Sequence, residues 1–162
     1  MAALTAATAR RYRLRGKSEM QNFRVLNAHT IYFGSFVCMP GTAGLTSARG
    51  YARTYSNTQT VEWLGLAIGS PFDLSTTNTI VGDTSATPII EVTCETSAFV
   101  LEQYAVTGVS AQTDVGKAFY ASNDNDLTLT SSQSPAVGRI DYWWSSTTCD
   151  VLFYGRTAAI VI

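Results

Sequence analysis

The stretch DVGKAFYASNDNDLTLTSSQSPAVGRI, residues 114–140, decides the fold, because it reads as short strands separated by turns. Residues 117–121 are a β-leaning run, and residues 122–126 are a polar cluster that can turn the chain. In residues 127–130, leucine alternates with threonine, as in a strand with one buried face. Pro135 and Gly138 bracket a further strand. We recognise no catalytic motif on this stretch, and it therefore indicates a structural protein.

Strand-like runs recur on both sides of this stretch, with turn residues between them. Apolar and polar residues alternate most clearly over residues 90–95, and no segment after residue 29 has helical periodicity. We expect strands near residues 30–38, 61–69, 78–82, 88–95, 97–106, 117–121, 126–130, 136–144 and 148–162, the last broken near Gly155. The sequence thus predicts an all-β fold, a small β-sandwich or barrel-like domain with an extended N-terminal arm.

The charges divide the chain into an arm, residues 1–29, and a β-rich domain, residues 30–162. Residues 1–24 hold six basic residues and one acid, a net charge of +5, whereas the remainder holds five basic residues and eleven acids, a net charge of −6. A basic arm on an acidic body favours an anionic partner for the arm. The arm residues that we expect to contact this partner are Arg10, Arg11, Arg13, Arg15, Lys17, Phe23 and Arg24.

The composition fits one soluble domain, because the chain has 162 residues and 46% of them are hydrophobic. No apolar run reaches the 18 or so residues of a membrane span, so we expect no membrane partner. The Arg-rich, acid-poor start also fits an organelle transit peptide, and this interpretation of the arm stays open at this point.

The residues that commonly bind metals are few and dispersed. Cys38, Cys94 and Cys149 lie more than fifty residues apart in the sequence, and the chain has one histidine, so we expect buried, inert thiols and no zinc site. The run Asn123–Asp126 lacks the spacing of an EF-hand and favours a tight turn made by its own side chains. We expect neither a metal nor a cofactor.

The inventory of catalytic groups argues against an enzyme. The chain has no G-x-S-x-G elbow, no P-loop and no dinucleotide fingerprint, and no acid adjoins its single histidine, His29. Four carboxylates in strand-like runs could meet in space, but the solvent-facing side of a strand explains them more simply: Asp83, Glu91, Glu95 and Glu102. We expect no catalytic activity.

Trp143 and Trp144 are adjacent in one predicted strand and should therefore point to opposite faces of the sheet. Core packing explains one of them. We expect the outward member to lie in a subunit contact, where tryptophan is enriched, at a threefold axis between subunits. The sequence leaves open which of the two is outward.

Residues 114–140, continued by CDVLFYG at residues 149–155, resemble the small decoration (cement) proteins of tailed-phage capsids. Their C-terminal halves often contain DVGK, YAS, TLT and VGR in this order. The segment TIYFGSFVCMPGTAGLTSARGYA, residues 30–52, is similar to the first hairpin of such proteins, and VEWLGLAIG, residues 61–69, to the strand that follows. The Arg-rich start and the tryptophan pair depart from the family pattern.

The resemblance implies a homotrimer on the outer surface of the virion, made in the host cytoplasm. Its partner would be the major capsid protein, and each arm would lie across a neighbouring capsid subunit. Nucleic acid is not an expected partner in this interpretation.

Two other functions remain open on the sequence. One is a jelly-roll coat protein of a small virus, in which the arm would bind nucleic acid. The other is a glycan-binding β-sandwich of a phage fibre, which would use exposed aromatic residues such as Tyr51, Tyr55 and Trp63.

Overall fold

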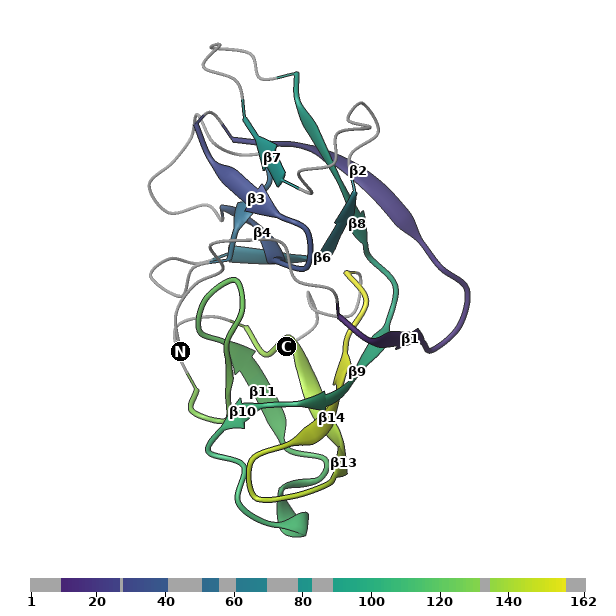
Figure 1. Ribbon diagram of the computed structural model, residues 1–162, viewed down its shortest axis with the longest axis vertical. Helices are drawn as coiled ribbons and strands as arrows, with labels where there is room; N and C mark the ends of the chain where they lie inside the picture. The colour runs from purple at the N-terminus through teal and green to yellow at the C-terminus, as the bar shows by residue number, and fades with distance from the viewer. Residues whose placement is uncertain are drawn as a thin grey trace.

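The computed structural model describes residues 10–26, 28–40, 51–55, 61–69, 79–82, 89–131 and 135–156 of the chain. These residues form strands and one short 3₁₀ turn, η1 (Gln112–Asp114). Among them, no helix has the length and apolar character that a membrane span needs. The predicted all-β, sandwich-like fold is confirmed (Figure 1).

The strands form three sheets. The largest has seven strands, in the order β1 (Tyr12–Leu14), β9 (Phe99–Tyr104), β14 (Cys149–Phe153), β13 (Gly138–Trp143), β11 (Ala118–Ala121), β12 (Leu127–Thr128) and β10 (Val106–Thr107). The second has five strands, in the order β2 (Met20–Arg24), β8 (Glu91–Glu95), β6 (Val61–Gly69), β4 (Phe36–Pro40) and β5 (Arg53–Thr54). The third pairs β3 (Thr30–Tyr32) with β7 (Thr79–Val81).

The five-stranded sheet is the middle layer, because a separate core covers each of its faces. The core toward the seven-stranded sheet contains Trp63 and Leu66 of β6, and the core toward β3 and β7 contains Leu64 and Ala67 of the same strand. Both faces of β6 are therefore buried. This explains why the apolar residues of VEWLGLAIG run almost without interruption, as they do in strands that are covered on both sides.

Phe153 is the centre of the larger core. Its ring stacks on Phe99 at 4.7 Å and on Trp63 at 5.2 Å, and it also contacts the rings of Phe36 and Phe119. These residues come from both of the larger sheets. One aromatic cluster therefore joins the two layers.

The predicted strands are observed with changes at the turns. The run predicted over residues 30–38 is two strands, β3 and β4, because the chain turns between them at Gly34, whose φ is 90°. Strands β1, β2 and β5 were not predicted. The end of the last predicted strand, residues 157–162, lies outside the described residues.

The N-terminal segment does not extend away from the body over residues 10–24. Strand β1 pairs antiparallel with β9, from Tyr12 opposite Leu101 to Leu14 opposite Phe99. Strand β2 pairs antiparallel with β8, from Met20 opposite Glu95 to Arg24 opposite Glu91. A boundary between arm and domain at residue 29 therefore does not describe this part of the chain, which forms the edge strand of both large sheets (Figure 1).

Candidate binding surface

Three of the seven predicted arm residues make polar side-chain contacts with the body of the same chain. They are Arg10, Arg13 and Arg15, and each forms a hydrogen bond or ion pair with a residue more than eighty positions away in the sequence. Arg10 also donates a hydrogen bond to Gly34. Phe23 is buried in the smaller core, where Arg156 lies over its ring at 5.1 Å. The remaining three, Arg11, Lys17 and Arg24, are exposed.

Arg10 is enclosed by aromatic rings and polar atoms. Its guanidinium group donates hydrogen bonds to the Gly34 carbonyl oxygen, the Tyr104 hydroxyl and, at 2.8 Å, Asn125 Oδ1. It also lies 4.7 Å from the centre of the Phe36 ring and 5.1 Å from that of Tyr104. These contacts use the planar shape and several donors of arginine at once, so Arg10 fastens the N-terminal segment to both large sheets.

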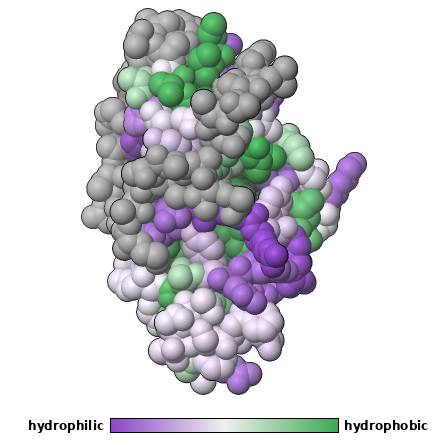
Figure 2. Space-filling model, viewed as in Figure 1, coloured by the Kyte–Doolittle hydropathy of each residue, from purple (hydrophilic) through white to green (hydrophobic). Residues whose placement is uncertain are grey.

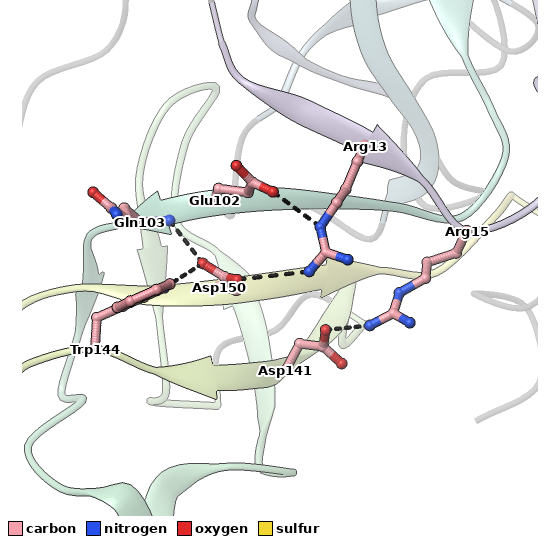
Figure 3. A network of polar contacts seen from close by, with 7 residues as sticks. All are labelled: Arg13, Arg15, Glu102, Gln103, Asp141, Trp144 and Asp150. Atoms are coloured by element: carbon pink, nitrogen blue, oxygen red, sulfur yellow. Dashed lines mark hydrogen bonds and ion pairs between the residues drawn. The ribbon is translucent and has the colours of Figure 1, made fainter.

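A row of polar side chains crosses four neighbouring strands of the seven-stranded sheet (Figure 3). Asp150 of β14 is at its centre, and its carboxylate accepts hydrogen bonds from the Gln103 backbone N–H at 2.9 Å and from Trp144 Nε1 at 2.6 Å. Arg13 lies between Glu102 and Asp150, at 3.0 Å and 3.7 Å from their oxygens. We call the following set the Asp150 network: Arg13, Arg15, Glu102, Gln103, Asp141, Trp144 and Asp150.

Backbone irregularities place Asp150 where it can accept these bonds. The pairing of β14 with β9 shifts register between Cys149 and Val151, and Gln103 of β9 has a positive φ of 50°. Such a shift interrupts the regular ladder and leaves a backbone N–H in need of another acceptor. The Asp150 carboxylate supplies it, so the side chain is held against the sheet and is only 5% exposed.

The outward member of the tryptophan pair is Trp144. Its side chain is 51% exposed, whereas Trp143 packs against the larger core. The pairing of β13 with β14 shifts register between Ile140 and Tyr142, and Tyr142 is also outward, at 54% exposed. The rings of Tyr142 and Trp144 meet edge to face, with centroids 4.9 Å apart.

Glu95 anchors the turn that joins β1 to β2. Its carboxylate is buried and accepts hydrogen bonds from Ser18 Oγ at 2.7 Å, Ser97 Oγ at 2.6 Å and the backbone N–H groups of Glu19 and Ser97. Burial by itself raises the pKa of this carboxyl group, but the four hydrogen bonds outweigh burial and leave the pKa lowered. A buried charge with this many donors is a structural anchor.

The polar residues of the stretch that decides the fold also build structure. Asp114 accepts hydrogen bonds from Lys117 Nζ at 2.7 Å and from the backbone N–H groups of Ser110 and Ala111, which hold its pKa well below the usual range. Asn123 Oδ1 accepts from the backbone N–H groups of Asn125 and Asp126, each at 2.8 Å. The turn interpretation of residues 123–126 is therefore confirmed.

The described residues include no group of three or more His, Cys, Asp or Glu side chains that could hold a metal ion. Cys38, Cys94 and Cys149 are all buried free thiols, as expected. Burial raises the pKa of Cys94, and burial followed by the charges of Asp150 and Asp114 raises that of Cys149 to about 12. At neutral pH both thiols stay protonated, the form that is not nucleophilic.

The other candidate residues are dispersed. His29 is half-buried, and burial together with the charge of Arg53 lowers its pKa. Of the four carboxylates that could have met in space, Glu95 anchors a turn, Glu102 belongs to the Asp150 network and Asp83 lies outside the described residues. The prediction that Tyr55 and Trp63 are exposed is wrong, because they are 3% and 1% exposed and pack in the larger core.

Sequence analysis named the tryptophan pair, Arg13, Arg15 and Glu102 as separate candidates and did not predict that they form one network. Arg13, Glu102, Asp141 and Asp150 meet only because β1, β9, β14 and β13 are neighbours in the sheet, and two register shifts orient Asp150 and Tyr142. The one available signal was the aromatic run YWW, residues 142–144, together with the acidic residues of two predicted strands.

Comparisons of the chain with protein-family models, with curated proteins and with solved structures found no match.

Proposed function

We propose that this protein is a capsid decoration protein that binds the outer surface of a tailed-phage head and stabilises it. In this proposal it is a homotrimer, made in the host cytoplasm, its partner is the major capsid protein, and it catalyses no reaction. The resemblance of residues 114–155 to decoration proteins is the starting point of the proposal.

The observation that carries the proposal is that the polar residues of this stretch form the hydrogen bonds of its turns. Asp114 and Lys117 close the turn before β11, and Asn123 and Asp126 close the turn before β12. Gly138 lies where a Cβ would be 2.1 Å from the Leu152 carbonyl oxygen. A motif whose residues shape strands and turns is what a scaffold requires, whereas a catalytic motif presents its groups to a substrate.

The N-terminal segment supports a particular way of binding. Strands β1 and β2 are the edge strands of their sheets, and an edge strand offers its backbone N–H and C=O groups to a further strand. The Arg24 carbonyl oxygen already accepts a hydrogen bond from the Ala52 N–H, so we infer that an extended segment of the capsid protein adds to this edge along the earlier residues of β2. The exposed cations Arg11, Lys17 and Arg24 would orient the edge toward acidic capsid surface.

Charge reversal at one exposed arginine tests this proposal. Arg24→Glu, on β2, should weaken cosedimentation of the protein with undecorated heads, whereas Arg139→Glu, an equal charge change on the exposed side of β13, should leave it unchanged. Electron microscopy of the decorated heads should show trimers at capsomer junctions. Equal binding by both variants would refute the orienting role of β2, and failure of the unaltered protein to bind heads would refute decoration itself.

The coat-protein alternative predicts a different assembly state for the purified protein. A coat protein would assemble into shells by itself and would bind nucleic acid with steep salt dependence. The purified decoration protein should instead stay a small oligomer at every salt concentration.

A further inference from the structure

The exposed aromatic pair Tyr142 and Trp144 is a prearranged surface. Each ring is about half exposed, and the two rings hold each other edge to face. Trp144 is fixed further, because its only polar atom, Nε1, donates to Asp150. Asp150 is itself held by the Gln103 N–H and by Arg13. The exposed part of the Trp144 ring is therefore apolar carbon on a side chain that has already lost most of its freedom.

Charged side chains of both signs lie on the same side of the sheet as Trp144 and pair with one another (Figure 3). Arg13 pairs with Glu102, and Arg15 pairs with Asp141. Both arginines and Glu102 are between two-fifths and about half exposed, so their outer donors and acceptors remain accessible to a ligand. Figure 3 shows Arg15–Asp141 and Arg13–Glu102 on the same side of the sheet as Trp144.

The balance of charge decides which class of ligand fits. Three carboxylates and two guanidinium groups lie in the Asp150 network, and the ion pairs among them cancel most of the local field. A surface that selects an anion or a cation would carry one sign of charge. This surface instead offers hydrogen-bond donors and acceptors side by side, which suits a neutral ligand with many hydroxyl groups.

The same charges argue against a contact between subunits at this place. The centre of a protein interface is depleted of charged residues, and its apolar area is contiguous. Here, Trp144 lies on the same side of the sheet as the five charged side chains of the Asp150 network (Figure 3), and it donates a hydrogen bond to one of them, Asp150. Figure 2 likewise shows a band of hydrophilic surface across the middle of the molecule, where Figure 1 places β1 and β9.

We propose that the surface formed by Tyr142, Trp144 and the Asp150 network binds neutral carbohydrate. The C–H face of a sugar ring carries weak positive charge and would stack on the aromatic rings, whose faces are negative. The sugar hydroxyls would donate to Glu102 and accept from Arg13 and Arg15. This proposal does not depend on capsid binding, since it concerns the outward face of the seven-stranded sheet alone.

Native gel electrophoresis through neutral polysaccharides tests the proposal. The probes are dextran, laminarin, mannan and galactan, each polymerised into the gel, with heparin as an anionic comparison. We expect retardation by at least one neutral polymer, unchanged between low and high salt because screening weakens only charge-based binding. Trp144→Ala and Tyr142→Ala should each raise the dissociation constant about tenfold or more, as removal of a central aromatic anchor does.

Controls separate loss of the surface from loss of the fold. Val81→Ala changes an apolar side chain that is 57% exposed on β7 and should leave retardation unchanged. Trp144→Phe keeps a ring but lacks the donor to Asp150, and should bind better than Trp144→Ala and less well than the unaltered protein. Circular dichroism melts of all variants establish that they are folded.

Three results would overturn the proposal. The first is no retardation by any neutral polymer, and the second is retardation by heparin alone, which would make the surface an anion site. The third is a smaller oligomer mass of Trp144→Ala in light scattering, with unchanged retardation, which would assign Trp144 to the subunit contact expected from the sequence.

Discussion

Gly65 of β6 lies against the backbone of Glu95 in β8. A Cβ on Gly65 would be 2.0 Å from the Glu95 carbonyl oxygen, and the φ of Gly65 is 146°. A residue with a side chain would be strained in this conformation and would also force apart β6 and β8, the two central neighbours of the middle layer. This contact explains why glycine interrupts the apolar run VEWLGLAIG.

Gly65→Ala should lower the free energy of unfolding by about 3 kcal/mol or more, which combines backbone strain with displacement of a packed strand. Gly69→Ala is the matched control, because Gly69 is in the same strand and a Cβ there meets nothing within 4 Å. Urea unfolding followed by circular dichroism measures both. Equal stability of the two variants would contradict the close approach of the strands.

Removing residues 1–24 should destabilise the body. The deletion removes β1 and β2, uncovers the edges of β9 and β8 and takes Phe23 out of the smaller core. Loss of a buried phenylalanine alone costs about 3 kcal/mol. A thermal melt of this deletion should show a much lower midpoint, whereas deletion of residues 1–9, which removes no described residue, is the comparison. An unchanged midpoint for the longer deletion would mean that residues 1–24 do not stabilise the body and form an independent arm.

Arg10→Ala should destabilise the protein by about 1–3 kcal/mol, because it removes hydrogen bonds and cation–π contacts that join the N-terminal segment to both sheets. Arg10→Lys should recover little of this, since a lysine cannot reproduce the planar fork. Arg11→Ala, an exposed neighbour, should change stability by less than about 0.5 kcal/mol. Chemical denaturation compares the three variants.

Glu95 makes the free energy of unfolding depend on pH in the acidic range. Its folded pKa is lowered, so its contribution to stability is complete well above the ordinary glutamate pKa of 4.5 and is lost as pH falls through the folded pKa. Unfolding free energies between pH 7 and pH 3 should fall less steeply for Glu95→Gln than for the unaltered protein. The variant should also be less stable at pH 7, because neutral Gln is a weaker acceptor for its four donors.

The sequence predicted the class of the fold because strand signals are local. Alternation over residues 90–95, the turn at Asn123–Asp126 and the glycine-bounded strands all depend on near neighbours in the chain. Strands β1 and β2 escaped prediction because their side chains are almost all exposed and their stability comes from backbone pairing with β9 and β8. Such pairing leaves no hydrophobic period in the sequence.

The candidate surface was less predictable than the fold. The alternation rule placed Trp143 and Trp144 on opposite faces, and the structure agrees. The rule would also place Tyr142 and Trp144 on the same face as buried Ile140, and it fails there because the register shifts between Ile140 and Tyr142. Register and sheet order depend on the whole chain, and so does the meeting of Arg13 with Asp150.

The three buried thiols allow a test of whether the two cores open together. Cys38 and Cys149 lie in the core around Phe153, and Cys94 lies in the smaller core with Phe23. Buried thiols should not react with N-ethylmaleimide at pH 7 in the native protein, and all three should react in denaturant. Phe23→Ala leaves a cavity in the smaller core only, so labelling of Cys94, located by peptide mass spectrometry, should accelerate in that variant before labelling of the other two. Equal acceleration at all three cysteines would mean that the layers open as one cooperative unit, in which the five-stranded sheet transmits the loss from one face to the other.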